Sequence, residues 1–237
     1  MISQHTYTAL GDRAVLIEVK SGVSEEDDSM SAAALARKIK AYKLKGITDI
    51  VPAFSRIAIH YDPNMWVSSS LSPFETIVQY LEKNLVTEDP ILIATKPQLI
   101  RIPVCYDLKM GLDLSDISLT LGVSIDDVIN LHQSAVYTVG AIGFAPGFAY
   151  LEGLDPALKI PRRDAPRTRV PSGSVAIAAG YSGIYPSTLP GGWHILGRTR
   201  RSFFQKEGDF GSLLSVGDQV KFEIISVEAY EAIESDF

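Results

Sequence analysis

Hydrophobic and polar positions in the first third of the chain change repeatedly between the spacing of a strand and that of a helix. Residues Arg13–Val19 form an apolar run that predicts a buried strand, and apolar positions at helical spacing predict a helix over Met30–Tyr42. Two further runs, Ile47–Pro52 and Arg56–Tyr61, predict a pair of strands, because apolar and polar residues alternate in the second. This part of the chain therefore starts as a strand, a helix and two strands.

A second helix is predicted to begin beside Ser72. Ser72 can cap the helix, Pro73 suits its first turn, and Glu75 completes a capping box. Apolar residues then follow at helical spacing: Phe74, Ile77, Val78, Leu81 and Leu85. We therefore expect an α+β sandwich domain in residues 1–95, with both helices on one face of an antiparallel sheet.

The pattern weakens over residues 88–98 and then resumes with shorter elements. A strand over Gln98–Tyr106 is followed by two short helices, Leu114–Leu121 and Ile125–Gln133. Short apolar runs separated by Gly and Pro come next: Val136–Phe144, Val175–Ala179, His194–Gly197 and Val220–Ile225. Repeated short strands with turn signals are typical of closed or partly closed barrels. We therefore expect a second, mainly-β barrel domain in residues 96–237.

One segment, Gly143–Arg198, differs from the rest of the chain in composition. It holds 9 of the 18 glycines and 7 of the 13 prolines, so turns set its backbone. From Lys159 to Arg201 the chain has eight Lys or Arg residues and one acidic residue, whereas the whole chain has a net charge of −6. Arginines held beside prolines favour an anion-binding surface in an otherwise acidic protein.

The candidate site residues all lie in this segment. Its candidate anion ligands are four arginines: Arg162, Arg163, Arg167 and Arg169. Guanidinium groups bind a carboxylate or a phosphate equally well, although a solvated loop paired with the acidic remainder of the fold is the alternative. His194 is a candidate acid or base. Six turn residues are expected to supply pocket walls through their backbone: Gly143, Pro146, Gly147, Pro190, Gly191 and Gly192.

Several other kinds of site find no support in the sequence. No GxxxxGK[ST] phosphate loop occurs, and GYSG at Gly180–Gly183 lacks the central serine of a nucleophile elbow. The four histidines are not at metal-ligand spacing from one another, so no metal is expected. Among them, His132 ends a predicted helix, where a positive charge suits the helix dipole. Cys105, the single cysteine, is expected to be a buried and inert thiol.

The charge and hydropathy of the chain also restrict its partners. The acidic balance argues against general binding to nucleic acid or to an anionic membrane. Leu119–His132 is similar to a helix-turn-helix, but its second helix carries two aspartates and no basic residue, which disfavours DNA. The chain has no apolar run of about 20 residues and no signal-peptide pattern at its start, so we expect a cytoplasmic protein.

Four stretches of this chain, taken in order, resemble a known family. In chain order they are LGDRAV at Leu10–Val15, IPVCYD at Ile102–Asp107, the string from Gly143 to Thr199, and LLSVGDQVKF at Leu213–Phe222. Together they are similar to the KipI / allophanate hydrolase subunit 1 family, and the resemblance covers almost the whole chain. It implies an α+β N-terminal domain followed by a cyclophilin-like β-barrel domain.

The resemblance also implies a function within a complex. The family includes the B subunits of bacterial 5-oxoprolinases, which pair with a related C subunit and, with an A subunit, carry out the ATP-dependent opening of 5-oxoproline to glutamate. ATP is therefore the expected cofactor, bound at the interface with the partner subunit, and the isolated chain is expected to be inactive. Two alternatives stay open: an inhibitor that acts on a sensor histidine kinase by protein contact, and a subunit related to urea carboxylase and allophanate processing.

The sequence departs from the family pattern at one place. Members often read VCYGG with an acidic residue soon after, whereas this chain reads VCYDLKMGLD from Val104 onward. Either Asp107 or Asp113 replaces the usual acid, or its role is missing.

Overall fold

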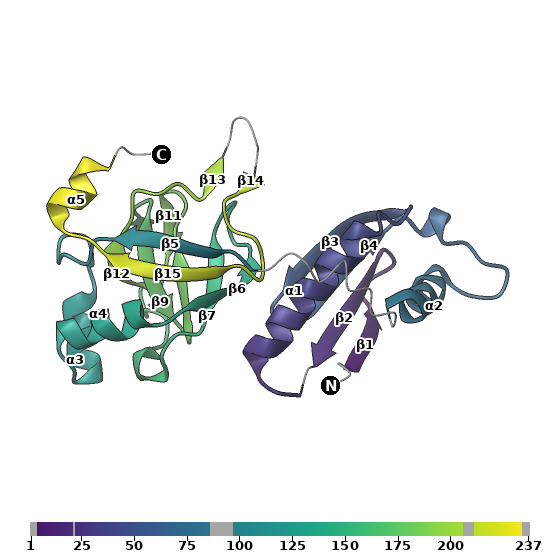
Figure 1. Cartoon of the computed structure of the whole chain (residues 1–237), viewed down its shortest axis with the longest axis horizontal. Helices are drawn as coiled ribbons and strands as arrows, with labels where there is room; N and C mark the ends of the chain where they lie inside the picture. Colours follow the sequence, from purple (N-terminus) through teal and green to yellow (C-terminus); the bar gives the residue numbers. More distant parts are fainter. Residues whose placement is uncertain (1–3, 21, 86–96, 206–210, 234–237) are drawn as a thin grey trace. The chain divides into compact units, whose positions relative to one another are not determined.

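The computed structural model describes residues 4–20, 22–85, 97–205 and 211–233. The chain divides into two compact units, Met1–Pro97 and Gln98–Phe237 (Figure 1). That the two units are separate domains stays a prediction.

The first unit is an antiparallel four-stranded sheet in the order β1-β2-β4-β3. The strands are β1 (Gln4–Ala9), β2 (Ala14–Lys20), β3 (Ile47–Ala53) and β4 (Arg56–Tyr61). The helices are α1 (Glu25–Ala41), α2 (Pro73–Leu85) and a 3-10 turn, η1 (Pro63–Met65). One buried cluster joins residues of both helices to the inward side chains of β2 and β4, so α1 and α2 pack on the same face, as the sequence predicts.

The two helices of this unit begin at capping residues. Ser72 and Glu75 form the predicted capping box at α2: the Ser72 N–H donates to the Glu75 carboxylate at 2.8 Å, and the Glu75 N–H donates to the Ser72 hydroxyl at 3.2 Å. Helix α1 begins five residues earlier than its apolar pattern predicts. Ser24 caps it by accepting the Asp27 N–H at 3.1 Å, and four acidic residues in the first turn complement the helix dipole.

The second unit is built on a nearly closed, barrel-like sheet of seven strands in the order β12-β9-β10-β7-β6-β15-β5. Within this sheet β5 and β15 pair in parallel, and the other neighbouring strands pair antiparallel. In chain order the strands are β5 (Leu99–Val104), β6 (Tyr137–Ile142), β7 (Ala149–Glu152), β9 (Ser174–Ala178), β10 (Tyr181–Ile184), β12 (His194–Arg198) and β15 (Gln219–Ile224).

A short bridge joins the two edges of this sheet. Cys105, just after β5, exchanges two backbone hydrogen bonds of 2.9 Å with Arg198 at the end of β12. The bridge gives the sheet its nearly closed form, which is the coarse architecture expected from the repeated short strands. Cys105 is buried, as predicted for an inert thiol.

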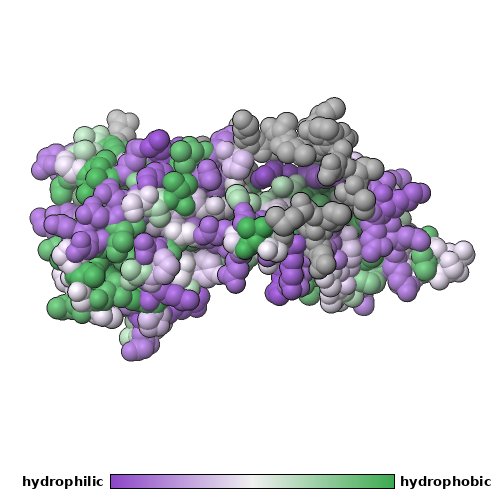
Figure 2. All heavy atoms as spheres, turned by 60° about the horizontal axis from the view of Figure 1, so that its bottom comes forward, coloured by the Kyte–Doolittle hydropathy of each residue, from purple (hydrophilic) through white to green (hydrophobic). Residues whose placement is uncertain are grey.

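Smaller elements surround the barrel. Two short strand pairs flank it, β8 (Arg167–Val170) with β11 (Leu189–Gly191) and β13 (Phe204–Gln205) with β14 (Gly211–Ser212). The helices are α3 (Leu114–Leu121), α4 (Ile125–Ser134), α5 (Val227–Ala232) and the 3-10 turn η2 (Pro156–Leu158). On the face shown in Figure 2, hydrophobic and hydrophilic residues of the barrel unit are interspersed.

His132 lies in the last turn of α4, but it is not the helix-end cation that the sequence suggests. Its ring is fully buried in the barrel, stacked on Phe222 with centroids 4.7 Å apart. Its Nδ1 and Nε2 lie 2.8 Å from the Tyr106 hydroxyl and 2.9 Å from the Ser182 hydroxyl. Burial lowers the pKa of His132 to about 3, because the charged ring would lose its hydration. The residue therefore belongs to the core as a neutral, hydrogen-bonded group.

No helix in the described parts of the chain is both long and apolar enough to cross a membrane.

Candidate functional site

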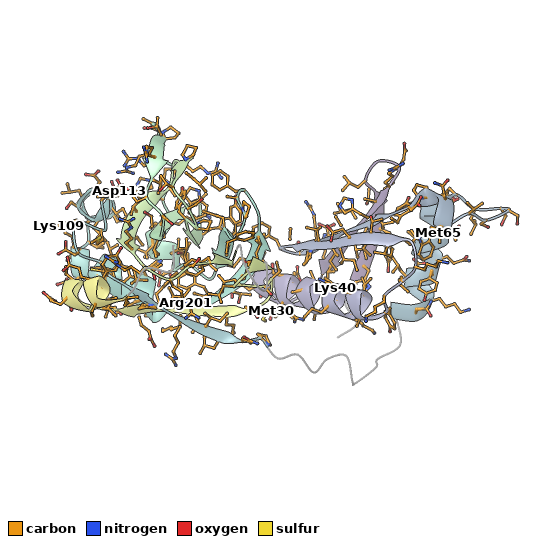
Figure 3. All side chains as sticks on the ribbon, turned by 90° about the horizontal axis from the view of Figure 1, so that it is seen from above. Met30, Lys40, Met65, Lys109, Asp113 and Arg201 are labelled. Carbon is orange, nitrogen blue, oxygen red and sulfur yellow. The ribbon has the colours of Figure 1, made fainter. Side chains whose placement is uncertain are left out.

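The centre of the candidate site is a buried carboxylate, that of Asp113. It lies immediately before α3, is labelled in Figure 3 within the barrel unit, and is fully buried. Its backbone N–H donates to the Ile195 carbonyl at 3.0 Å, and the Ile195 N–H donates to Asp113 Oδ2 at 2.7 Å. Asp113 is thus fixed to β12 through both its backbone and its side chain.

The turn before Asp113 explains how the carboxylate comes so close to β12. Asp107 closes this turn, because its side chain accepts the Lys109 N–H at 2.8 Å and its carbonyl accepts the Gly111 N–H at 2.7 Å. A Cβ at Gly111 would lie 2.2 Å from the Leu196 carbonyl oxygen, so only glycine fits against β12 here. The sequence leaves open whether Asp107 or Asp113 replaces the usual acid of the family. In the structure Asp107 shapes the turn, and Asp113 is the residue that contacts the predicted arginines.

Two of the four predicted arginines meet on Asp113. Arg163 Nη1 donates to Oδ1 at 2.6 Å. Arg167 binds in a two-point manner, with Nη2 2.7 Å from Oδ1 and Nη1 2.8 Å from Oδ2. Two guanidinium groups against one carboxylate leave one positive charge in the cluster. We call Asp113, Arg163 and Arg167 the arginine cluster.

The arginine cluster opens to solvent only through its arginines. The side chains of Arg163 and Arg167 are 27% and 23% exposed, whereas that of Asp113 is 1% exposed. The Arg163 Nε lies buried with no hydrogen-bond partner among the described residues. A buried N–H without a partner costs free energy, so this N–H is an unused donor of the cluster.

Backbone pairing holds the arginine segment in place. Strands β8 and β11 pair with Gly191 opposite Arg167, and the Arg163 N–H donates to the Gly192 carbonyl at 2.8 Å. The predicted wall residues Gly191 and Gly192 therefore lie directly beside two of the predicted ligands. Pro190, in the same strand as Gly191, is exposed.

Arg162 and Arg169 are not part of the arginine cluster. Both are exposed, and neither belongs to the ion pairs of Asp113. Arg163 and Arg167 thus pair with an acid of the fold and the other two arginines face solvent, as the alternative interpretation of the segment describes. That any of the four binds a ligand stays a prediction.

His194 faces the same segment from β12. Its Nε2 lies 3.0 Å from the Pro161 carbonyl oxygen. Because a carbonyl only accepts, Nε2 carries a proton in this contact. Nδ1 is buried with no partner among the described residues. That His194 acts as an acid or base stays a prediction.

Tyr185, which the predicted site residues do not include, connects the two predicted walls. A Cβ at Gly191 would lie 2.1 Å from the Tyr185 hydroxyl oxygen, so the two residues are in direct contact. Burial raises the pKa of Tyr185; a hydrogen bond with the Trp193 backbone and the charges of Arg162 and Arg167 act in the opposite direction. Its place among the aromatic residues of Gly143–Arg198 is the sequence signal that points to it.

The other predicted wall, the turn Gly143–Gly147, reaches Tyr185 through Phe144. The Phe144 ring packs edge-on against Phe148 and Tyr185, with centroid distances of 5.3 and 6.5 Å. Phe144 is 62% exposed and has a φ of +71°, a left-handed conformation that costs free energy in a residue with a side chain. Within the turn Pro146 is exposed, Gly143 half-buried and Gly147 buried. An exposed aromatic residue thus stands beside the tyrosine.

Within the described residues, no group of three or more His, Cys, Asp or Glu side chains is arranged to hold a metal ion. The site is instead a set of guanidinium donors, a histidine and a tyrosine hydroxyl. Such a set can bind an anionic, planar group and exchange a proton with it.

Comparison with known proteins identifies the family. The family model of the carboxyltransferase domain, subdomain C and D, matches residues 5–214. The B subunit of the 5-oxoprolinase of Bacillus subtilis is 32% identical over 242 residues, which cover 100% of this chain and 99% of that protein. The corresponding protein of Haemophilus influenzae is 44% identical over 129 residues, 54% of this chain and 61% of that protein.

A solved structure supports the same relationship. The crystal structure of TTHA0988 superimposes with a TM-score of 0.75 at 34% identity and covers 90% of this chain. The match takes up 40% of the TTHA0988 chain, so this chain spans less than half the length of that protein. The resemblance found in the sequence motifs is therefore confirmed: the chain belongs to the carboxyltransferase domain, subdomain C and D, family, together with the B subunits of 5-oxoprolinases.

Proposed function

We propose that this chain is the B subunit of an ATP-dependent 5-oxoprolinase, which opens the lactam of 5-oxoproline to glutamate together with a C and an A subunit. The observation that carries the proposal is the 32% identity to the B subunit of the Bacillus subtilis 5-oxoprolinase over essentially the full length of both chains. The site is compatible with it, since 5-oxoproline is a small, planar lactam with one carboxylate.

We propose that the active site is completed by a partner chain. The module occupies 40% of the TTHA0988 polypeptide, where a longer chain carries it together with further sequence. In the present protein the arginine cluster and Phe144 reach the surface of the barrel unit, which suits a half-site that a second subunit covers. The barrel is proposed to be cyclophilin-like and the complex to act in the cytoplasm.

The residues of this chain are proposed to handle the substrate rather than the nucleotide. The sequence has no phosphate loop, so the proposed ATP site lies at the interface with the partner subunit. ATP would supply the phosphoryl group that activates the lactam carbonyl toward water; addition of water and breaking of the ring C–N bond then give glutamate, with ADP and phosphate released. In this proposal Arg163 and Arg167 hold the substrate anion and His194 acts as the acid or base.

The test is reconstitution with its partners. The chain is co-purified with C-type and A-type partner subunits, and glutamate release from 5-oxoproline is followed with and without ATP. The proposal expects ATP-dependent glutamate release that needs all three proteins. Equal activity from the two partners alone would refute it. A parallel assay of histidine kinase autophosphorylation with the purified chain separates the enzyme component from an inhibitor.

A further inference from the structure

The carboxylate of Asp113, the acid of the arginine cluster, is too enclosed to react with a substrate. Both oxygens of Asp113 are engaged: Oδ1 accepts from Arg163 and Arg167, and Oδ2 accepts from Arg167 and the Ile195 N–H. The side chain is 1% exposed. A carboxylate that is enclosed and accepts four hydrogen bonds has no free position for a substrate atom.

We propose that Asp113 is a positioning residue, which fixes the guanidinium groups of Arg163 and Arg167 so that their solvent-facing edges bind the substrate carboxylate. The proposal rests on the proposed function and names the part of the substrate that this half-site binds. Neither arginine could hold one orientation as well without Asp113, because a long side chain at the surface samples many rotamers.

The free donors of the cluster favour a carboxylate. Arg167 directs its two Nη atoms at Asp113, and Arg163 directs one, so the remaining N–H groups, including the unpaired Nε of Arg163, belong to the other edges. An arginine edge made of Nε and Nη matches the two oxygens of a carboxylate. The Arg163 Nε itself is buried, so a carboxylate at the solvent-facing edges is held by the other, partly exposed guanidinium N–H groups.

The charge of the cluster points in the same direction. Two guanidinium groups and one carboxylate leave a single positive charge, which one substrate carboxylate neutralises. A triphosphate would bring several negative charges next to the buried Asp113 carboxylate and leave most of them unpaired. The exposed Arg162 adds a charge that solvent screens. The cluster therefore suits the substrate carboxylate and not the phosphates of ATP.

The first test measures kinetics of the assembled three-protein complex with Asp113→Asn. Asparagine keeps the shape but removes the charge that orients both arginines. The KM for 5-oxoproline should rise at least tenfold, while kcat changes less than threefold and the KM for ATP less than twofold. Glu223→Gln is the matched control, since it breaks the exposed Arg101–Glu223 pair of the same unit, whose N–O distance is 2.7 Å. It should leave all three constants unchanged.

Two results of that test would overturn the proposal. A lower melting temperature with an unchanged KM would make Asp113 a purely structural brace. Loss of one limb of the pH–kcat profile, with a large fall in kcat, would make it an acid or base. Arg167→Gln and Arg167→Lys serve if Asp113→Asn does not fold; the lysine variant, which keeps the charge without the two-point geometry, should raise the KM less than the glutamine variant.

A binding measurement separates the carboxylate from the rest of the substrate. Calorimetric titration of the Arg167→Gln complex should show at least thirtyfold weaker binding of 5-oxoproline, with the affinities for 2-pyrrolidinone, which lacks the carboxylate, and for ATP within twofold of wild type. An equal loss for all three ligands would contradict the assignment.

If the wild-type complex neither binds nor opens 5-oxoproline, the proposed function fails, and the positioning role is decided by a simpler probe. Acetate titrated into the full chain should then shift the amide resonances of Gly191 and Gly192, and Asp113→Asn should abolish those shifts. Shifts with inorganic phosphate alone, or none with acetate, would overturn the inference.

Discussion

Arg167 and Asp113 lie 54 positions apart in the sequence and form a two-point ion pair, with Nη2–Oδ1 and Nη1–Oδ2 distances of 2.7 and 2.8 Å. The pair ties β8 to the residue that precedes α3. Because the carboxylate is buried and the guanidinium is only partly exposed, the pair acts on stability and on the site together.

Removing the carboxylate should therefore destabilise the barrel unit. Asp113→Ala leaves Arg163 and Arg167 without a counter-charge and the Ile195 N–H without an acceptor. We expect a loss of about 3 kcal/mol in the free energy of unfolding, measured by urea denaturation. Glu223→Ala, which removes an exposed partner, should change it little. Equal losses of unfolding free energy for the two substitutions would show that Asp113 stabilises the fold no more than an exposed carboxylate does.

Stability should fall in acid because of His132. Its folded pKa of about 3 lies below the unfolded value of 6.5, so between these pH values the unfolded chain binds a proton at His132 and the folded chain does not. The stability is therefore fully present above pH 6.5 and is lost as the pH falls toward 3. Between pH 7.5 and 5.5 the wild type should lose about 1.4 kcal/mol more than His132→Gln, measured by urea denaturation at both pH values. Parallel losses would show that His132 titrates normally.

The contact between Gly191 and Tyr185 should be sensitive to a single methyl group. A Cβ at Gly191 falls 2.1 Å from the Tyr185 hydroxyl oxygen, so Gly191→Ala must displace the tyrosine. We expect a lower melting temperature and weaker substrate binding. Tyr185→Phe, which removes that oxygen, should partly restore the stability of the alanine variant. Gly211→Ala, outside the predicted site, is the control, because its added Cβ would meet open space; a similar effect there would show that the contact is not the cause.

Phe144 should be replaceable by glycine without loss of stability. Its φ of +71° is unfavourable for phenylalanine and free for glycine, and its ring is 62% exposed. Phe144→Gly should leave the free energy of unfolding unchanged or raise it by up to about 1 kcal/mol. The neighbouring Phe148→Ala, which empties a buried position, should cost about 3–5 kcal/mol in the same denaturation assay. A large loss for Phe144→Gly would mean that the exposed ring stabilises the fold.

The periodic elements of this chain could be predicted from the sequence because their signals are local. Strand Arg56–Tyr61 and helix Leu114–Leu121 have the predicted bounds, and the capping box at Ser72 forms. Within Gly143–Arg198 the predicted strands Val175–Ala179 and His194–Gly197 match β9 and β12 to within a residue, whereas β7, β8, β10 and β11 were not predicted. Strands of three or four residues carry too few alternating positions, and tertiary pairing decides them.

The sequence predicts which arginines belong to the candidate site, but not which residue they contact. Arg163 and Arg167 stand out because they are basic, clustered and flanked by prolines. That they meet on Asp113 could not be predicted from the sequence, because 50 and 54 residues separate them from it and chain folding alone brings them together. The prediction for His132 was wrong for the same reason: its helix-end position is local, whereas its burial against Phe222 is tertiary.

An add-back titration decides whether the chain is the B subunit of a 5-oxoprolinase. Fixed amounts of the C and A subunits receive increasing amounts of this chain, and glutamate and ADP are measured together. We predict that glutamate release from 5-oxoproline rises from background to a plateau at a fixed ratio of the three proteins, with ADP rising in step and no glutamate without ATP. Glutamate release that stays at background at every amount of added chain would be incompatible with this role.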